Sequence, residues 1–192
     1  MEQLSRARRL PALAALLLAA PLLAAPVTAN AAADDDAAQS ERTVADYVGS
    51  HRYVGGDTER ERALAAVEEI VEDLNVLIRG TARRLLSKTA TPAPEIAVAL
   101  DGDVVTIDSG KDRIPLTLGG PAVEYRGEDG KSYRMSARAA GGKLIVRIVG
   151  NSSTTVKTYR LSGDGARMSV KTKIAHPMMS KPLEYTFSYR RR

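Results

Sequence analysis

The second half of the chain alternates apolar and polar residues with a period of two, which is typical of strands that bury one face. Such alternations recur in short runs from Glu95 to the C-terminus, separated by dipeptides such as Asp101-Gly102 and Gly141-Gly142. These dipeptides favour tight turns because glycine readily adopts positive φ. The pattern predicts nine short, consecutively joined strands, and a further strand over residues 48–54 brings the total to about ten.

Between these strands, residues 58–88 follow a helical period. An apolar stripe runs along this segment at spacings of three or four positions, formed by Leu64, Val67, Val71, Leu74, Ile78, Ala82 and Leu85. Thr58 and Glu61 have the spacing of a capping box at the start of a helix. Gly80 is expected to kink or divide the helix, because an interior glycine costs about 1 kcal/mol against alanine. We expect the stripe to pack on the sheet.

Consecutive hairpins make an antiparallel meander, and a meander of this length must curl or close to protect its edges. The expected fold is therefore mainly β (α+β). It is an up-and-down meander of about nine or ten strands that forms a barrel or half-barrel. One long helix, at about 58–88, covers or plugs it.

The first residues have the features of a targeting segment. Arg6, Arg8 and Arg9 precede a Leu- and Ala-rich stretch of about sixteen residues, and Ala29-Asn30-Ala31 follows. A basic region, an apolar region and an A-x-A site are typical of a cleaved secretory signal. We predict a signal peptide over 1–31, a flexible leader over 32–43 and a single barrel-like domain over 44–192. The mature protein is then exported, to a periplasm or outside the cell, and has no transmembrane segment.

Composition excludes several kinds of site. The 192 residues contain no Cys and only two His, which leaves no disulfide, no thiolate nucleophile and no three-His metal site. Most Asp residues of the meander stand beside turn glycines, where they favour local hydrogen bonds. We therefore predict no catalytic residues, no metal and no cofactor. Removal of 1–31 leaves a net charge of +3, which is too mild to predict a nucleic-acid partner.

Aromatic and cationic side chains of the meander are the better candidates for binding. A Tyr offers an apolar ring with one hydrogen-bonding tip, which suits an amphiphilic ligand in a small barrel. Arg147 stands in a strand that is apolar on both faces, so it could anchor a carboxylate or phosphate. The candidate ligand-binding residues are Tyr125, Tyr133, Arg147, Tyr159 and Tyr185. In the alternative, these tyrosines fill the core or line the rim and Arg147 points to solvent.

The order of one strand, a helical segment and a long meander resembles the calycin architecture of lipocalins and fatty-acid-binding proteins. In the latter, a broken helical pair lies between the first two strands and caps the barrel; residues 58–88 occupy that place here. Residues 159–165 look like a strand–turn–strand element common in small exported bacterial barrel proteins of unassigned function. The resemblance is one of topology, and it implies a barrel that binds a small ligand.

We therefore expect an exported, non-catalytic binding protein for a small amphiphilic or lipid-like ligand. The first alternative is a periplasmic or envelope protein-interaction or structural module whose barrel core is filled. The second alternative is a hydrolase, for which the sequence offers carboxylates but no nucleophile motif. The pattern leaves open the ligand, the oligomeric state and whether the barrel is closed.

Overall fold

The computed structural model of the chain describes residues 42–110, 113–127 and 129–192. The predicted signal peptide and most of the leader lie outside the described residues. The helices are η1 (Val44–Tyr47), α2 (Gly56–Glu72) and α3 (Val76–Thr89). The strands are β1 (Gly49–Tyr53), β2 (Glu95–Asp101), β3 (Val104–Asp108), β4 (Arg113–Thr117), β5 (Val123–Arg126), β6 (Ser132–Ala140), β7 (Lys143–Val149), β8 (Thr154–Leu161), β9 (Arg167–Ala175) and β10 (Leu183–Arg191).

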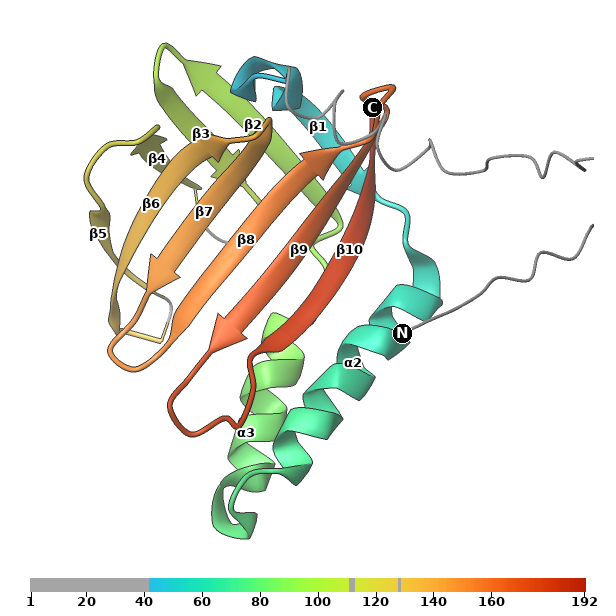
Figure 1. Ribbon diagram of the computed structural model, residues 1–192, viewed down its shortest axis with the longest axis vertical. Helices are drawn as coiled ribbons and strands as arrows, with labels where there is room; N and C mark the ends of the chain where they lie inside the picture. Colours follow the sequence, from blue (N-terminus) through green and yellow to red (C-terminus); the bar gives the residue numbers. More distant parts are fainter. Residues whose placement is uncertain (1–41, 111–112, 128) are drawn as a thin grey trace, which may run out of the picture.

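The ten strands form one antiparallel sheet in the order β4-β3-β2-β1-β10-β9-β8-β7-β6-β5. Its free edges come together where Leu118 forms a bridge with Ala137 and the Gly119 amide donates to the Ala137 carbonyl at 2.8 Å. The result is a nearly closed barrel, with β6–β10 as its near wall in Figure 1. The predicted meander is confirmed. Its turns have the expected glycines, for example Gly102 at φ 54° and Gly141 at φ 53°.

Strand β1 links the early strands of the sheet to the last one, β10. It pairs with β2 on one side and with β10 on the other, through His51↔Arg191 to Tyr53↔Tyr189. Strand β10 continues well beyond β1, and α2 lies along this extension instead (Figure 1). One bond across the α2–β10 seam runs from the Ser188 amide to the Glu59 carboxylate, at 2.8 Å.

The helical segment differs from the expected single helix. It divides into α2 and α3 at residues 73–75, not at Gly80, which lies inside α3. The Asn75 side chain caps α3 by accepting a hydrogen bond from the Leu77 amide at 3.0 Å, which stabilises a new helix start there. The predicted capping box of Thr58 and Glu61 is also wrong, because α2 begins at Gly56 and Thr58 therefore lies inside the helix. No helix among the described residues has the length and apolar content needed to span a bilayer.

Of the two α-helices, α2 contributes a buried face. Its buried side chains, Ala63, Val67, Ile70 and Val71, join the strand residues in one apolar core, which also includes Val44 and Tyr47 of η1. Helix α3 has no fully buried residue, and Leu77 on it is 90% exposed. The predicted stripe is therefore buried at Val67, Val71 and Leu74, while Leu64 and Leu85 at its two ends are exposed. Helix α3 lies against α2 and extends beyond the barrel (Figure 1), with Ala82 and Leu86 packed partly on the core.

The short helix η1 closes the end of the barrel away from α2 and α3. The Tyr47 hydroxyl donates to the Gly142 carbonyl at 2.7 Å and lies 3.1 Å from the Tyr159 carbonyl. Behind it, His51 is fully buried, with Nε2 2.9 Å from the Tyr47 carbonyl. Nε2 must carry the proton to donate this bond, so Nδ1 is an acceptor. Nδ1 has no hydrogen-bond partner among the described residues. Arg191 binds the carbonyls of Asp46 and Val48 from outside.

Truncation of α2 tests whether its buried face stabilises the barrel. Ile70→Ala should lower the free energy of unfolding by about 3 kcal/mol, because it opens a cavity in the core. The matched control Leu77→Ala removes an exposed side chain of α3 and should change it by less than about 0.5 kcal/mol. Urea unfolding followed by circular dichroism measures both values. Equal effects would contradict the packing described for α2.

Burial of His51 predicts a specific pH dependence of stability. Desolvation lowers the pKa of His51 from 6.5. The hydrogen bond with the Tyr47 carbonyl raises this pKa, and the charge of nearby Arg191 lowers it. Below about pH 6.5 the unfolded chain binds this proton and the folded chain does not, so the free energy of unfolding falls as the pH falls. The limiting slope is about 1.4 kcal/mol per pH unit.

The measurement is urea unfolding at several values between pH 5 and 7.5. His51→Gln should flatten the pH dependence, whatever its effect on overall stability. His176→Gln is the control, because His176 lies in the β9–β10 loop outside the apolar core, and it should leave the pH dependence unchanged. A wild-type slope in His51→Gln would show that another group is responsible.

Candidate functional site

Strand alternation decides which polar side chains face the inside of the barrel. Lys157 on β8 is directly opposite Thr172 on β9, which in turn is directly opposite Tyr185 on β10. Val146 on β7 completes this line and is buried in the apolar core, which places the whole line on the inner face. We call Lys157, Thr172 and Tyr185 the inner polar row.

Helix α3 anchors one end of the inner polar row. The Tyr185 hydroxyl donates to the Thr89 carbonyl, in the last turn of α3, at 2.7 Å. The Tyr185 pKa is raised by burial, and hydrogen bonds with Thr89 and Thr172 partly oppose this shift. Lys157, at the other end, is half-buried. The row thus combines two hydroxyl groups and one ammonium group within a mainly apolar wall.

Two of the predicted tyrosines lie together near the free sheet edge. Tyr125 and Tyr133 are cross-strand neighbours whose rings stack with centroids 5.5 Å apart. The Tyr133 hydroxyl donates to the Asp129 carboxylate at 2.8 Å. Burial raises the pKa of Tyr133 to about 12, and the Asp129 carboxylate makes the second-largest contribution. Both tyrosines are half-buried, and Tyr125 packs against the core.

The other predicted residues fall on opposite sides of the wall. Tyr159 and Tyr185 both face inward, but Tyr159 is opposite Val170 and so belongs to the next line of residues. Burial raises the pKa of Tyr159. Arg147 is opposite Ser136 and Val156 on the outer face and is exposed. The structure therefore does not bring Arg147 together with the four tyrosines.

Sequence reasoning missed Lys157, which is the cation on the inner face of β8. The sequence could have identified Lys157, because residues two positions apart on a strand face the same side and Lys157 is two positions before Tyr159. It also missed an aromatic group in which the Tyr53 ring lies 5.8 Å from Phe187 and 5.7 Å from Tyr189. His51 is a further inward-facing residue, with an unpartnered Nδ1.

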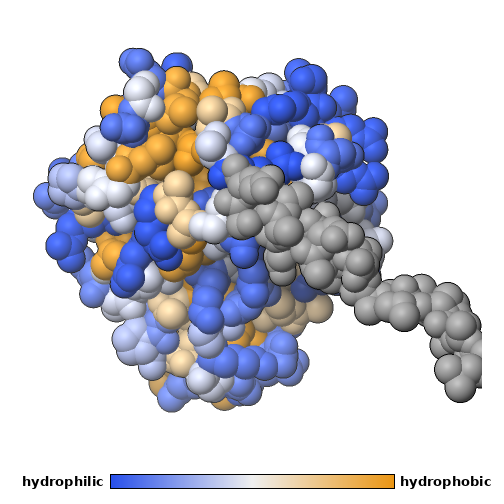
Figure 2. Space-filling model, turned by 45° about the horizontal axis from the view of Figure 1, so that its top comes forward, coloured by the Kyte–Doolittle hydropathy of each residue, from blue (hydrophilic) through white to orange (hydrophobic). Residues whose placement is uncertain are grey.

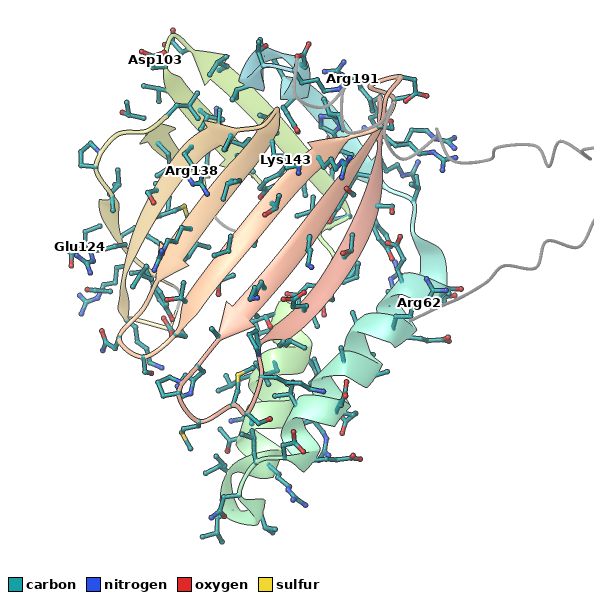
Figure 3. The ribbon with its side chains drawn as sticks, in the orientation of Figure 1. Arg62, Asp103, Glu124, Arg138, Lys143 and Arg191 are labelled. Carbon is teal, nitrogen blue, oxygen red and sulfur yellow. The ribbon has the colours of Figure 1, made fainter. Side chains whose placement is uncertain are left out.

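Two grooves flank α2 where it meets β10. One has a volume of about 330 Å³ and is lined by Glu59, Arg62, Ala63, Glu184, Tyr185 and Thr186. The second, of about 240 Å³, lies towards the β9–β10 loop and is lined in part by Ile70 and Leu183. Tyr185 is among the residues that line the first groove, so the groove borders one end of the inner polar row. Arg62 marks its helical side in Figure 3.

One contact has the residue types of a hydrolytic site. The Ser152 hydroxyl lies 3.0 Å from His176 Nε2, and His176 Nδ1 accepts a hydrogen bond from the Met178 amide at 3.1 Å. Because Nδ1 is an acceptor, neutral His176 carries its proton on Nε2 and cannot take the proton of Ser152. Ser152 is exposed and His176 is half-buried. Within the described ranges, no three His, Asp or Glu side chains gather as metal ligands do.

Comparisons with known proteins bear on the fold. No protein-family model and no curated protein matches the sequence. Among solved structures, the chain is similar to apo lipid binding protein 8 of Caenorhabditis elegans: the TM-score is 0.53 and the identity 14%, over 79% of this chain and 99% of that one. It is also similar to a Schistosoma mansoni fatty acid binding protein in complex with arachidonic acid, with a TM-score of 0.46 and 16% identity, over 78% of this chain and 98% of that one.

At these identities the likeness shows the fold alone. The strand order and the place of the helical segment after the first strand agree with the expected architecture. The structure adds the division of that segment into two helices and the near closure of the barrel. The chain therefore has the calycin-like barrel fold of the fatty-acid-binding proteins.

Proposed function

We propose that this protein is an exported, non-catalytic binding protein for a small amphiphile, which it holds inside the barrel. The observation that carries the proposal is the inner polar row, a short line of polar groups on a mainly apolar inner wall. Pockets for small molecules commonly combine an apolar lining with a few polar groups that fix orientation. Export rests on the signal-like sequence of residues 1–31.

The inner polar row suits an acidic headgroup. The Lys157 ammonium can form charge-assisted hydrogen bonds with a carboxylate or phosphate, and the Thr172 hydroxyl can add another bond. The apolar chain of the ligand would lie against side chains such as Ile148 and Phe187, which belong to the core or pack on it. Tyr125 and Tyr133 would line the side near the free sheet edge.

We infer that the ligand enters at the α2–β10 seam. The hydrogen bond from the Ser188 amide to the Glu59 side chain joins the two elements there, and an ion pair links Lys181, in the β9–β10 loop, to Glu69 on α2. Exposed ion pairs contribute little to stability. A modest displacement of α2 would therefore widen the groove that already reaches Tyr185.

Native mass spectrometry of the protein, purified without denaturation from cells that export it, is the first test. A copurified amphiphile at close to one per chain, identified after denaturing extraction, would support the proposal. An empty protein that also fails to bind an added long-chain fatty acid would contradict it.

A charge-removing variant tests the headgroup site. Lys157→Met should weaken binding of a fluorescent long-chain fatty acid by about tenfold or more, because one charged hydrogen bond is lost. Binding of the corresponding fatty alcohol should change little. Arg147→Met is the matched control, since Arg147 lies on the outer face, and it should leave both affinities unchanged. Equal losses in the two variants would contradict an inner site at Lys157.

A filled protein-interaction module is the second candidate. It is favoured by close packing at the η1 end of the barrel, where Tyr47, His51, Leu144 and Met168 have no exposed surface. The same mass spectrum separates the two functions. A monodisperse protein that stays empty in the presence of fatty acid, and that captures a defined envelope protein, would favour this module.

A further inference from the structure

The outer wall of the barrel is strongly basic. Outward-facing positions of β6–β10 hold one carboxylate, Glu184, which forms ion pairs with Lys171 and Lys173. Against it stand nine cations, namely Arg134, Arg138, Lys143, Arg147, Arg160, Arg167, Lys171, Lys173 and Arg190. Hydrophilic residues cover much of the molecule in Figure 2. The net charge of the chain stays small in spite of this basic wall, because α2 is rich in Asp and Glu.

Six cations form a continuous line across this wall, one from each of six neighbouring strands. In strand order from β6 through β10 to β1, they are Arg138, Lys143, Arg160, Arg167, Arg190 and Arg52. Arg138 and Lys143 can be followed in Figure 3. Adjacent strands are about 4.8 Å apart and alternate residues about 6.6 Å, so neighbouring positions in the line are about 5 to 8 Å apart. We call this line the basic track.

Part of the basic track is unfavourable for folding. Arg167 is directly opposite Arg190, and Arg190 is directly opposite Arg52. Like charges that face each other across strands are destabilising. Within the part of the chain that the structure describes, no ion pair joins these three arginines to a carboxylate. The next residue in this line is Glu95 on β2, and its carboxylate pairs with Arg192. A solvent-facing wall needs only polar residues at these positions, so packing does not explain three adjacent arginines.

We propose that the basic track binds a linear acidic polysaccharide, that is, a glycan chain with regularly spaced sulfate, phosphate or carboxylate groups. A line of guanidinium groups matches such a chain, because each can make two parallel hydrogen bonds to one oxyanion. The proposal is independent of any ligand inside the barrel, since the track lies on the outer face.

Two other polyanions fit the track less well. Single-stranded nucleic acid is usually held by aromatic side chains that stack on its bases, and the outward positions of β6–β10 and β1 hold no Tyr or Phe. A flat anionic membrane meets the track poorly, because the six strands span more than half of a curved barrel wall. A flexible chain can follow that curve.

Binding of fluorescently labelled heparin oligosaccharides, a sulfated glycan probe, tests the proposal at about 0.1 M salt. The variant Arg52→Gln, Arg167→Gln, Arg190→Gln should bind at least about tenfold more weakly, with a shallower dependence of affinity on salt. The control Arg113→Gln, Arg134→Gln, Arg147→Gln removes the same charge from exposed positions outside the track and should stay within about threefold of wild type. Equal losses in both variants would overturn the proposal, because they would show attraction by net charge alone.

Two competitors and one stability measurement complete the test. Single-stranded DNA and anionic phospholipid vesicles, at equal total charge, should compete at least about tenfold less well than unlabelled heparin. Equal or stronger competition by either would overturn the assignment to a glycan. The track variant should also melt at a higher temperature than wild type, since like-charge contacts are removed. A lower melting temperature would overturn the premise that the row of arginines is unfavourable.

Discussion

Strand β1 pairs with β2 on one side and with β10 on the other, and the closure of the barrel depends on this double pairing. The strand has five residues and β10 has nine, so pairing leaves much of β10 without a strand neighbour on that side. Helix α2 fills the place and seals the wall with Ala63, Val67 and Ile70. A helix cannot continue a β-ladder, so side chains hold this seam, and it is the natural place for the wall to open.

The same closure divides the barrel interior into two parts. At the η1 end, His51 and Leu144 are fully buried and Tyr47 is hydrogen-bonded to two carbonyls, so packing is tight. Towards the helices, Lys157 and Tyr133 stay partly exposed and polar groups gather on the inner wall. Tight packing stabilises the closed end, whereas hydroxyl and ammonium groups at the other end retain capacity for a polar ligand group.

Charge is separated in the same molecule. Acidic residues concentrate on α2 and in the turns, while the outer wall of β6–β10 is basic. Barrel strands bury alternate residues and leave the others to solvent, so the fold constrains the outer residues only weakly. The row Arg52–Arg190–Arg167 departs from what stability alone would favour. This departure, more than the net charge, identifies the outer wall as a surface for recognition.

The sequence by itself determined the number of strands and their order along the chain, because most connections between them hold a glycine that favours a turn and most strands show an alternation. It also determined that a helix follows the first strand and buries Val67 and Val71. Tertiary structure decided the rest. Alternation separates the two faces of a strand but does not say which face is inside; closure therefore placed Lys157 inward and Arg147 outward. Local propensity favoured a break at Gly80, but the Asn75 cap and the packing of α3 on α2 moved it to residues 73–75. Such choices depend on contacts between segments far apart in the chain, which local sequence patterns do not contain.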